Sequence, residues 1–257
     1  MKQYKAYCFD LDGTVYRGKE GIPSAVAFIH RLQQAGIEPF YVTNNSSKTR
    51  EQLQEALLSI GVDAPLEHIY SSALVTAKYV ALHFPGKKVA MMGGTDGIRQ
   101  ALLNENIVPV EDEPDVFVMG IDRTLDYMAL ARATVFVQQG ATFIATNQDI
   151  KFPTEYGFLP GNGSFARLVG EVADVEPIYI GKPSPAMLEV IATEHGIAKE
   201  DMVMIGDNYD TDIMCGIRFG CDTIHVNTGV TLQRLSSKKN ATYICSGRTK
   251  VIKGCLC

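Results

Sequence analysis

Four short groups of polar residues each follow an apolar run that is typical of a buried strand. The groups contain carboxylates, amides, a hydroxyl and one lysine. Because ligand chemistry collects at the carboxyl ends of the strands in an open parallel sheet, we expect these groups to meet at one edge. Together they could hold a divalent cation, attack a phosphorus atom and neutralise a phosphoryl group. The four groups are residues 10–14, 43–45, 182–183 and 206–212.

The first third of the chain alternates strand-like and helix-like segments. A helix-like segment carries Val26, Ile29 and Leu32 on one face, and Gly36 follows it as a stop signal. This alternation predicts an α/β fold built on a parallel sheet. We expect strands at residues 4–9, 37–42 and 69–71 and helices at residues 24–35, 51–60 and 72–83.

A second α/β segment interrupts this pattern. Residues 84–87 are typical of a linker, and the first pattern resumes at the apolar run 178–180. We therefore predict a core made of residues 1–83 and 177–257, with a second α/β domain inserted at residues 84–176. The strands expected from residue 84 onward are 89–92, 116–119, 142–145, 178–180, 202–205 and 223–226, and the helices lie near 97–103 and 125–137, from Ser164, and at 210–219.

Composition argues against several classes of protein. The chain has 257 residues and a net charge of −5 without a run of Lys or Arg, so we expect no nucleic-acid partner. No apolar run approaches the roughly 18 residues that a membrane span needs, so we expect no membrane partner. The first predicted strand starts by Tyr4, so we expect no targeting segment before it. The cysteines form no CxxC pair, which argues against zinc and against a disulfide framework. We expect a cytoplasmic protein, with a frayed terminus at residues 247–257.

Asp10 and Asp12 end the first predicted strand. Gly13 indicates that the chain turns there, so both carboxyl groups and the Asp12 carbonyl can approach one point. Mg²⁺ prefers such oxygen ligands and keeps several waters. For an isolated Asp-x-Asp, a solvated acidic turn would be the favoured interpretation.

Thr43, Asn44 and Asn45 follow the second core strand. A hydroxyl and a backbone N–H at this point can bind phosphoryl oxygens, although the same residue types also cap helices. Lys182 lies between a predicted strand and a predicted helix, where its ammonium could act as a point charge for phosphate. An ordinary surface lysine is the alternative for that residue.

Asp207, Asp210 and Asp212 follow the apolar run that ends at Ile205. One aspartate is expected as a helix cap, because its carboxylate accepts backbone hydrogen bonds and interacts favourably with the helix dipole. Three within six residues exceed the needs of a cap. Crowded carboxylates raise one another's pKa, so a cation would stabilise them.

Taken in order, the four groups resemble the four motifs of the haloacid dehalogenase (HAD) superfamily. Residues 10–14, DLDGT, are similar to its DxDGT motif, while Thr43, Lys182 and residues 206–212 resemble motifs II, III and IV. The predicted insertion falls where the C2-type cap of the family lies. The strings VTNNSS, ATNQD, PGNGS and IGKPS resemble the NagD / 4-nitrophenylphosphatase branch.

This resemblance implies a Rossmann-like parallel-sheet core with an inserted α/β cap, and a Mg²⁺-dependent phosphatase. Asp10 would be the nucleophile that forms an aspartyl-phosphate, and Asp12 the general acid and base. Mg²⁺ would be held by Asp10, the Asp12 carbonyl and Asp207, with Asp212 nearby. The residues expected to bind the phosphoryl group of a small phosphorylated metabolite are Thr43, Asn44, Asn45 and Lys182.

Other functions remain open from the sequence. A dehalogenase needs neither Asp12 nor the acidic group at 206–212, a phosphonatase needs a Schiff-base lysine for which we find no candidate, and a receiver domain is shorter. The alternative that remains is a catalytically idle protein of this fold that binds small phosphorylated molecules. A turnover assay would separate it from an enzyme.

The substrate and the oligomeric state are also open. Sugar phosphates, nucleotides, pyridoxal phosphate and glycolytic by-products are all compatible with the motifs. Asn147, Asp149 and the loop 160–164 are candidates for substrate selection by the inserted domain, and ordinary loop chemistry would explain them equally well.

Overall fold

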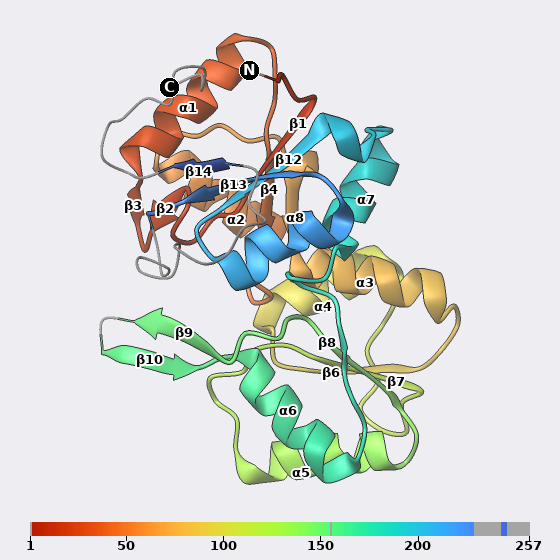
Figure 1. The fold of residues 1–257 in the computed structure, drawn as a ribbon. Helices are drawn as coiled ribbons and strands as arrows, with labels where there is room; N and C mark the ends of the chain where they lie inside the picture. Colours follow the sequence, from red (N-terminus) through yellow and green to blue (C-terminus); the bar gives the residue numbers. More distant parts are fainter. Residues whose placement is uncertain (1, 155, 229–242, 246–257) are drawn as a thin grey trace. The chain divides into compact units, whose positions relative to one another are not determined.

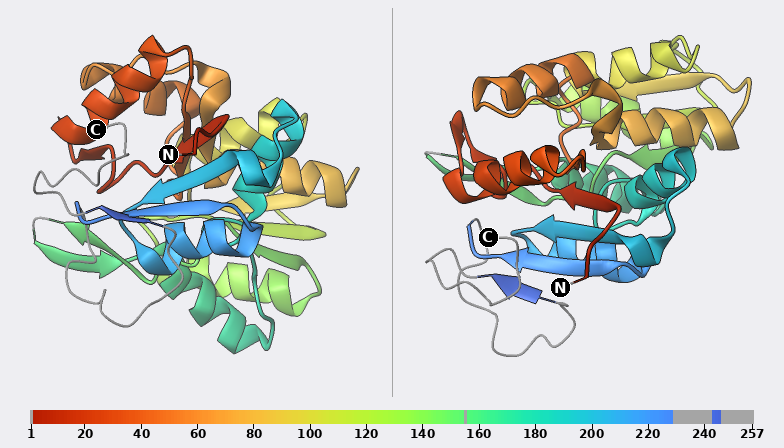
Figure 2. Two further views of the ribbon diagram at one scale, coloured as in Figure 1. Left: turned by 45° about the horizontal axis from the view of Figure 1, so that its top comes forward. Right: turned by 90° about the horizontal axis from the view of Figure 1, so that it is seen from above.

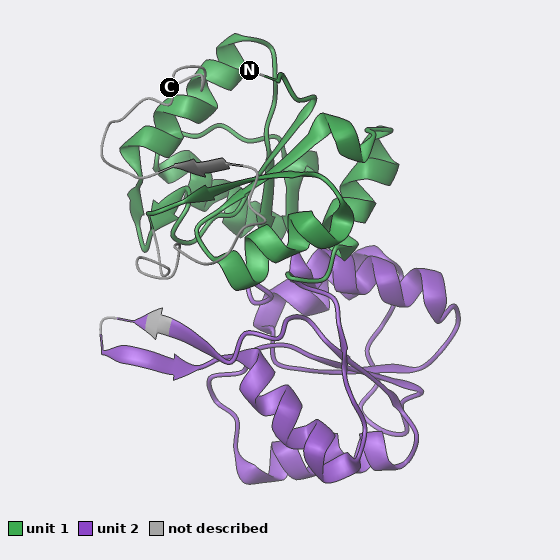
Figure 3. Ribbon diagram, in the orientation of Figure 1, with its two compact units in different colours: residues 1–43, 50–70, 182–257 green, residues 44–49, 71–181 purple. Residues whose placement is uncertain are grey.

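The computed structural model describes residues 2–154, 156–228 and 243–245 (Figure 1). The tail at residues 247–257 lies outside the described residues. The chain divides into two compact units (Figure 3). The first unit consists of Met1–Thr43, Arg50–Tyr70 and Lys182–Cys257, and the second of Asn44–Thr49 and Ser71–Gly181.

A six-stranded sheet forms the centre of the first unit. The pairs from β14 to β4 are parallel, and Cys8 on the central strand pairs with Met204 on one side and Phe40 on the other. The predicted α/β fold with a parallel sheet is therefore confirmed. The strand order is β14 (Tyr243–Cys245), β13 (Asp222–Val226), β12 (Met202–Gly206), β1 (Ala6–Phe9), β4 (Phe40–Thr43) and β5 (Ile69–Ser71).

Helices cover both faces of this sheet (Figure 2). On one face they pack Ile29, Leu32, Leu53 and Leu57 against Phe9 and other strand residues, which form a continuous apolar core. Strand β1 is buried along its whole length, as expected for a central parallel strand. The helices are α1 (Pro23–Gln34) and α2 (Arg50–Ser59) on one face, and α7 (Ala186–His195) and α8 (Met214–Phe219) on the other.

Four further short elements lie in the connections of the first unit. The two-residue strands follow the turn after β1 and pair with each other in antiparallel orientation. The single helical turns precede β5 and β12. These elements are β2 (Tyr16–Arg17), β3 (Glu20–Gly21), η1 (Leu66–His68) and η2 (Lys199–Asp201).

The second unit has its own parallel sheet of four strands and its own core. Successive residues of a strand point to opposite faces, and Val118 and Met119 are both fully buried, so both faces of the sheet are covered. Two helices pack on each face (Figure 1). The sheet order is β11 (Ile178–Tyr179), β8 (Thr142–Ala145), β7 (Val116–Met119) and β6 (Val89–Met92), with α3 (Ser72–His83) and α4 (Thr95–Asn104) on one face and α5 (Tyr127–Gln138) and α6 (Asn162–Ala173) on the other.

An antiparallel hairpin extends from the second unit (Figure 1). It consists of β9 (Lys151–Thr154) and β10 (Gly157–Pro160), and every residue of β10 is exposed. We predicted no strand in this region, whose prolines and glycines are typical of loops. Two such short strands carry little sequence signal, because neither has the alternation of a strand that packs on a core.

One predicted strand belongs to the other sheet. Residues 178–180 were expected to resume the core pattern, but β11 pairs with β8 in the second unit. An apolar run of three residues is compatible with the edge of either sheet, and this one pairs with β8. Lys182 therefore follows a strand of the second unit and not one of the core.

The second unit is also larger than the predicted insertion at 84–176. It includes α3, which packs against α4, and the loop 44–49, whose Ser47 carbonyl accepts hydrogen bonds from Thr95 and Gly97. That this unit acts as a cap stays a prediction. None of the described helices is both long and apolar enough to cross a membrane.

Two neighbouring leucines on α2 test this description of the core. Leu57 is fully buried, whereas Leu58 is 60% exposed. We expect Leu57→Ala to lower the free energy of unfolding by about 2–5 kcal/mol, because it leaves a cavity. Leu58→Ala should change it by less than about 0.5 kcal/mol. Urea denaturation of the two variants measures both values, and equal losses would contradict the packing of α2.

Candidate active site

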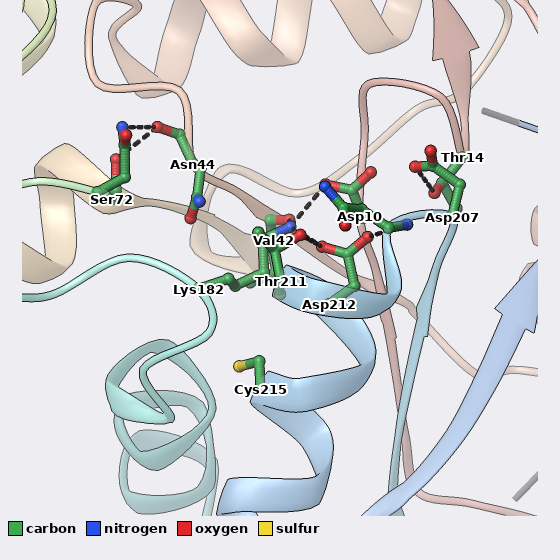
Figure 4. A network of polar contacts seen from close by, with 12 residues as sticks. Asp10, Thr14, Val42, Asn44, Ser72, Lys182, Asp207, Thr211, Asp212 and Cys215 are labelled. Atoms are coloured by element: carbon green, nitrogen blue, oxygen red, sulfur yellow. Dashed lines mark hydrogen bonds and ion pairs between the residues drawn. The ribbon is translucent and has the colours of Figure 1, made fainter. Parts of the chain in front are cut away.

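Three buried carboxylates meet at the carboxyl ends of two central strands (Figure 4). Asp10 directly follows β1 and Asp207 directly follows β12, which are neighbours in the sheet. Asp212 lies in the π-helical turn η3 (Tyr209–Ile213). One oxygen atom from each carboxylate lies within 4.8 Å of the others. The sheet thus brings together acidic groups that are about 200 residues apart in sequence.

The ammonium of Lys182 lies among these carboxylates. Its Nζ is 2.6 Å from Asp10 Oδ1 and 2.8 Å from Asp212 Oδ1, and it donates to the Val42 carbonyl at 3.0 Å. Lys182 is 1% exposed, so it is not a surface lysine. Burial lowers its pKa, but the charges of Asp10 and Asp212 and their hydrogen bonds outweigh burial and raise it. The side chain therefore stays protonated.

One ammonium does not balance three carboxylates. If all three were ionised, Asp10, Asp207 and Asp212 would carry −3 against the +1 of Lys182, which would leave −2 in a buried cluster. Burial raises the pKa of Asp10 well above its ordinary value, and repulsion from Asp212 and Asp207 acts in the same direction, while Lys182 opposes them. A divalent cation would neutralise the remaining charge, and oxygen ligands suit such a cation. The donor set fits a divalent metal.

The backbone around Asp212 is shaped to hold its carboxylate. Asp212 Oδ2 accepts a hydrogen bond from the Asn208 N–H at 3.0 Å, and Oδ1 accepts one from the Thr211 hydroxyl at 3.2 Å. A Cβ atom at Gly206 would lie 2.3 Å from the Asp212 side chain, so only glycine leaves room for it. These contacts fix the carboxylate that binds Lys182.

Asp207 is held in a comparable way from the turn after β1. Its Oδ1 accepts a hydrogen bond from the Thr14 hydroxyl at 3.1 Å, and its carbonyl lies 2.9 Å from His225 Nε2. Gly13 has φ +92°, and a Cβ there would lie 2.8 Å from the Asp207 carboxylate. Glycine is needed at this position for both conformation and space.

Asp12 lies in the same turn but has an exposed side chain. The turn is tight, because the N–H groups of Val15 and Tyr16 both donate to the Leu11 carbonyl, at 2.8 and 3.1 Å. Tyr16 is buried, and burial, followed by the charges of Asp12 and Asp10, raises the pKa of its hydroxyl. The charges of both predicted catalytic aspartates therefore act on the Tyr16 hydroxyl.

The predicted phosphoryl-binding residues fall in different units. Thr43 is buried at the end of β4, next to the Val42 carbonyl that Lys182 binds. Asn44 and Asn45 belong to the second unit. Asn44 Nδ2 donates to Asp149 at 3.0 Å, and Asn45 Oδ1 accepts from two backbone N–H groups of its own loop, at residues 47 and 48. Both asparagine side chains thus take part in the structure of the loop.

The structure brings together Asp10, Asp207, Asp212 and Lys182, which the sequence predicted to converge. It adds several residues whose part in the site was not predicted from the sequence. Thr14, Gly206, Asn208 and Thr211 lie within the predicted motifs but had no role assigned, and Tyr16 and His225 lie outside the motifs.

Known families and proteins resemble this chain over most of its length. A model of the haloacid dehalogenase-like hydrolases matches residues 7–108, and a second model of HAD-like hydrolases matches residues 179–248. The acid sugar phosphatase of Staphylococcus aureus (strain MRSA252) is 48% identical over 240 residues, which cover 93% of this chain and 92% of that protein. The chain belongs to the haloacid dehalogenase-like hydrolases.

Two further relatives extend this likeness to the whole chain. The acid sugar phosphatase of Staphylococcus saprophyticus is 43% identical over 98% of each chain. The crystal structure of a double mutant of the thermostable NPPase from Geobacillus stearothermophilus aligns with a TM-score of 0.89 and 38% identity, over 96% of this chain and 97% of that one. The predicted family branch and the predicted class, a phosphatase of the HAD type, are confirmed.

The excess negative charge of the cluster predicts stabilisation by a divalent cation. At about 100 times its dissociation constant, a cation that binds only the folded state stabilises it by ~2.7 kcal/mol. We expect Mg²⁺ to raise the thermal midpoint by several degrees and EDTA to reverse the shift. Asp207→Asn should remove most of the shift, whereas the exposed Asp96→Asn should retain it. Equal shifts in both variants would place the cation elsewhere.

Proposed function

We propose that this chain is a Mg²⁺-dependent phosphatase that hydrolyses small phosphomonoesters through an aspartyl-phosphate at Asp10. The observation that carries the proposal is the position of the Asp10 carboxylate. It follows the central strand, 2.6 Å from a buried ammonium and within a buried acidic cluster suited to a divalent cation. A carboxylate is a suitable nucleophile for phosphorus, because the acyl-phosphate that it forms is readily hydrolysed.

In the first step, the Asp10 carboxylate attacks phosphorus through Oδ2, because Oδ1 accepts the hydrogen bond from Lys182 at 2.6 Å. The new bond forms as the ester P–O bond breaks, and the leaving alkoxide takes a proton from the Asp12 carboxyl. The exposed side chain of Asp12 allows this exchange with substrate and solvent. In the second step, Asp12 takes a proton from water, the water oxygen attacks phosphorus, and the Asp10 carboxylate leaves.

Charge neutralisation is the other requirement of phosphoryl transfer. Asp10, Asp207 and the Asp12 carbonyl would hold Mg²⁺, with Asp212 beside them. The bound ion would neutralise negative charge on the phosphoryl group and orient it. Lys182 supplies a fixed positive charge, and Thr43 supplies a hydroxyl at the neighbouring strand end. The pKa of Asp10 must fall for it to act as a nucleophile, which both cations favour.

Sugar phosphates are the substrate class that we propose. Relatives named acid sugar phosphatase are 43–48% identical over 93–98% of this chain. Nitrophenyl phosphate should serve as a generic substrate, because the NPPase relative shares the whole fold. A cytoplasmic location, the absence of a nucleic-acid or membrane partner, and a homo-oligomer as one possible assembly stay predictions.

Turnover tests the proposal directly. Purified protein with Mg²⁺ should release phosphate from sugar phosphates, and faster than from nucleotides or pyridoxal phosphate. Asp10→Asn should abolish turnover, because the amide cannot attack phosphorus. Asp12→Asn should be severely slow and should retain labelled phosphate when nitrophenyl phosphate supplies a good leaving group.

Asp96→Asn is the matched control and should keep wild-type activity. No phosphate release across the whole panel would favour the catalytically idle alternative. Label retained by Asp10→Asn but not by Asp12→Asn would reverse the two roles.

Lys182 allows a separate test of charge. Lys182→Ala leaves three buried carboxylates without their ammonium, so we expect activity to fall by at least ~100-fold. The protein should also become less stable, because an uncompensated buried charge costs about 3–5 kcal/mol. Lys182→Arg should recover little, since a planar guanidinium does not fit the space of a compact ammonium. The exposed Lys199→Ala is the control, and wild-type kinetics for Lys182→Ala would exclude an active-site role.

A further inference from the structure

The chain passes between the two units beside two of the predicted phosphoryl-binding residues. One crossing is the peptide bond from Thr43 to Asn44, and another is the bond from Gly181 to Lys182. Within the second unit, Asn44 and Gly181 lie against each other. A Cβ atom on Gly181 would be 2.7 Å from Asn44 Oδ1. The covalent neighbours of Thr43 and Lys182 are thus in contact.

Both of these neighbours are fastened to the segment that follows β8. The Gly181 N–H donates to the Thr146 carbonyl at 2.8 Å. Asn147 Nδ2 donates to the Asn44 carbonyl at 2.9 Å. Asn44 Nδ2 in turn donates to Asp149 Oδ2 at 3.0 Å. One short segment of the second unit therefore holds both crossings.

Both polar atoms of the Asn147 side chain form hydrogen bonds. Its Nδ2 binds Asn44, and its Oδ1 accepts from the Asp149 N–H at 3.1 Å. It is 5% exposed. The Asn44 carbonyl also accepts from the Ser72 hydroxyl at 2.8 Å, so α3 contributes to the same network (Figure 4). These groups stabilise the loop 44–49 and the segment after β8 through hydrogen bonds. Their polar atoms are thus used within the protein, whereas a residue that selects a substrate must present polar atoms to it.

The same two points are also linked within the first unit. Lys182 Nζ donates to the carbonyl of Val42, the residue before Thr43. The path from Val42 through Asn44 and back through Gly181 to Lys182 is therefore closed by contacts at both ends. Such closure fixes the separation of two groups better than either contact alone.

We propose that Asn44, Asn147, Asp149 and Gly181 form a clamp that sets the positions of Thr43 and Lys182. Asn147 and Asp149 are then positioning residues for the phosphoryl pocket, and not residues that select the rest of the substrate. The inference rests on the proposed function for the roles of Thr43 and Lys182. If the clamp is disrupted, kcat/KM should fall by a factor that does not depend on the leaving group, because every phosphomonoester presents the same phosphoryl group.

Variants at Asp149 separate the two roles. Asp149→Ala removes the acceptor for Asn44, and we expect kcat/KM to fall by ~10- to 100-fold. The factor should be the same for nitrophenyl phosphate, a hexose phosphate and a nucleoside monophosphate. Asp149→Asn keeps a carbonyl acceptor and should retain most of the activity. The inhibition constant of inorganic phosphate should rise with Asp149→Ala, although phosphate carries no group to be selected.

Opposite results would overturn the clamp. A loss confined to one substrate class, with an unchanged inhibition constant for phosphate, would assign Asp149 to substrate selection. Equal losses for Asp149→Asn and Asp149→Ala would mean that the charge of Asp149 matters and not its hydrogen bond. If the loss of kcat/KM in the double variant, as a free energy, equals the sum of the losses in Asn44→Ala and Asp149→Ala, the two residues do not act through one contact.

A pair of glycines controls for simple loss of stability. Gly181→Ala would place Cβ 2.6 Å from the Thr146 carbonyl, and Gly170→Ala would place it 2.6 Å from the Val175 carbonyl. Both should lower the thermal midpoint, but only Gly181→Ala should also weaken binding of inorganic phosphate in calorimetry. Equal phosphate binding in the two variants would refute the clamp. Absence of turnover in the wild type would refute the proposed function and not the clamp, because the calorimetric comparison of phosphate binding does not depend on turnover.

Discussion

A single buried ammonium shared by buried carboxylates is the interaction on which the site depends. Lys182 lies within 2.8 Å of both Asp10 and Asp212, and none of these groups could be buried at reasonable cost without the others. These residues are far apart in the sequence. The ends of strands β1 and β12 and the chain at residue 182 must therefore lie close together. The glycines at 13 and 206 follow from this requirement, since larger residues would displace the carboxylates.

The convergence of these groups could be predicted from the sequence, but their contacts could not. Asp10 and Asp207 follow apolar runs long enough to be recognised as central strands, and parallel sheets collect such strand ends at one edge. Asp212 was expected only nearby, because its contact with Lys182 depends on the π-helical turn that follows Asn208. A turn of that kind leaves no periodic signal in the sequence.

The errors in the fold have a common origin in short segments. Residues 178–180 were assigned to the core sheet because the pattern of three apolar residues says nothing about which strand edge they will join. The loop 44–49 was assigned to the core by its place in the chain, although its hydrogen bonds lie with Thr95, Gly97 and Asn147 of the second unit. In both segments, contacts with residues distant in the sequence determine which unit the segment joins. Such contacts cannot be predicted from the local composition of a segment.

The loop 44–49 also bears on how a protein of this kind could be rebuilt. An inserted domain is ordinarily treated as a module with one entry and one exit, and it can be exchanged at those two points. Here the second unit also includes a six-residue piece of the host sequence. A chimaera that replaced only residues 71–181 would leave this piece without its partners. Any exchange of the second unit between relatives must therefore transplant two segments, residues 44–49 together with residues 71–181.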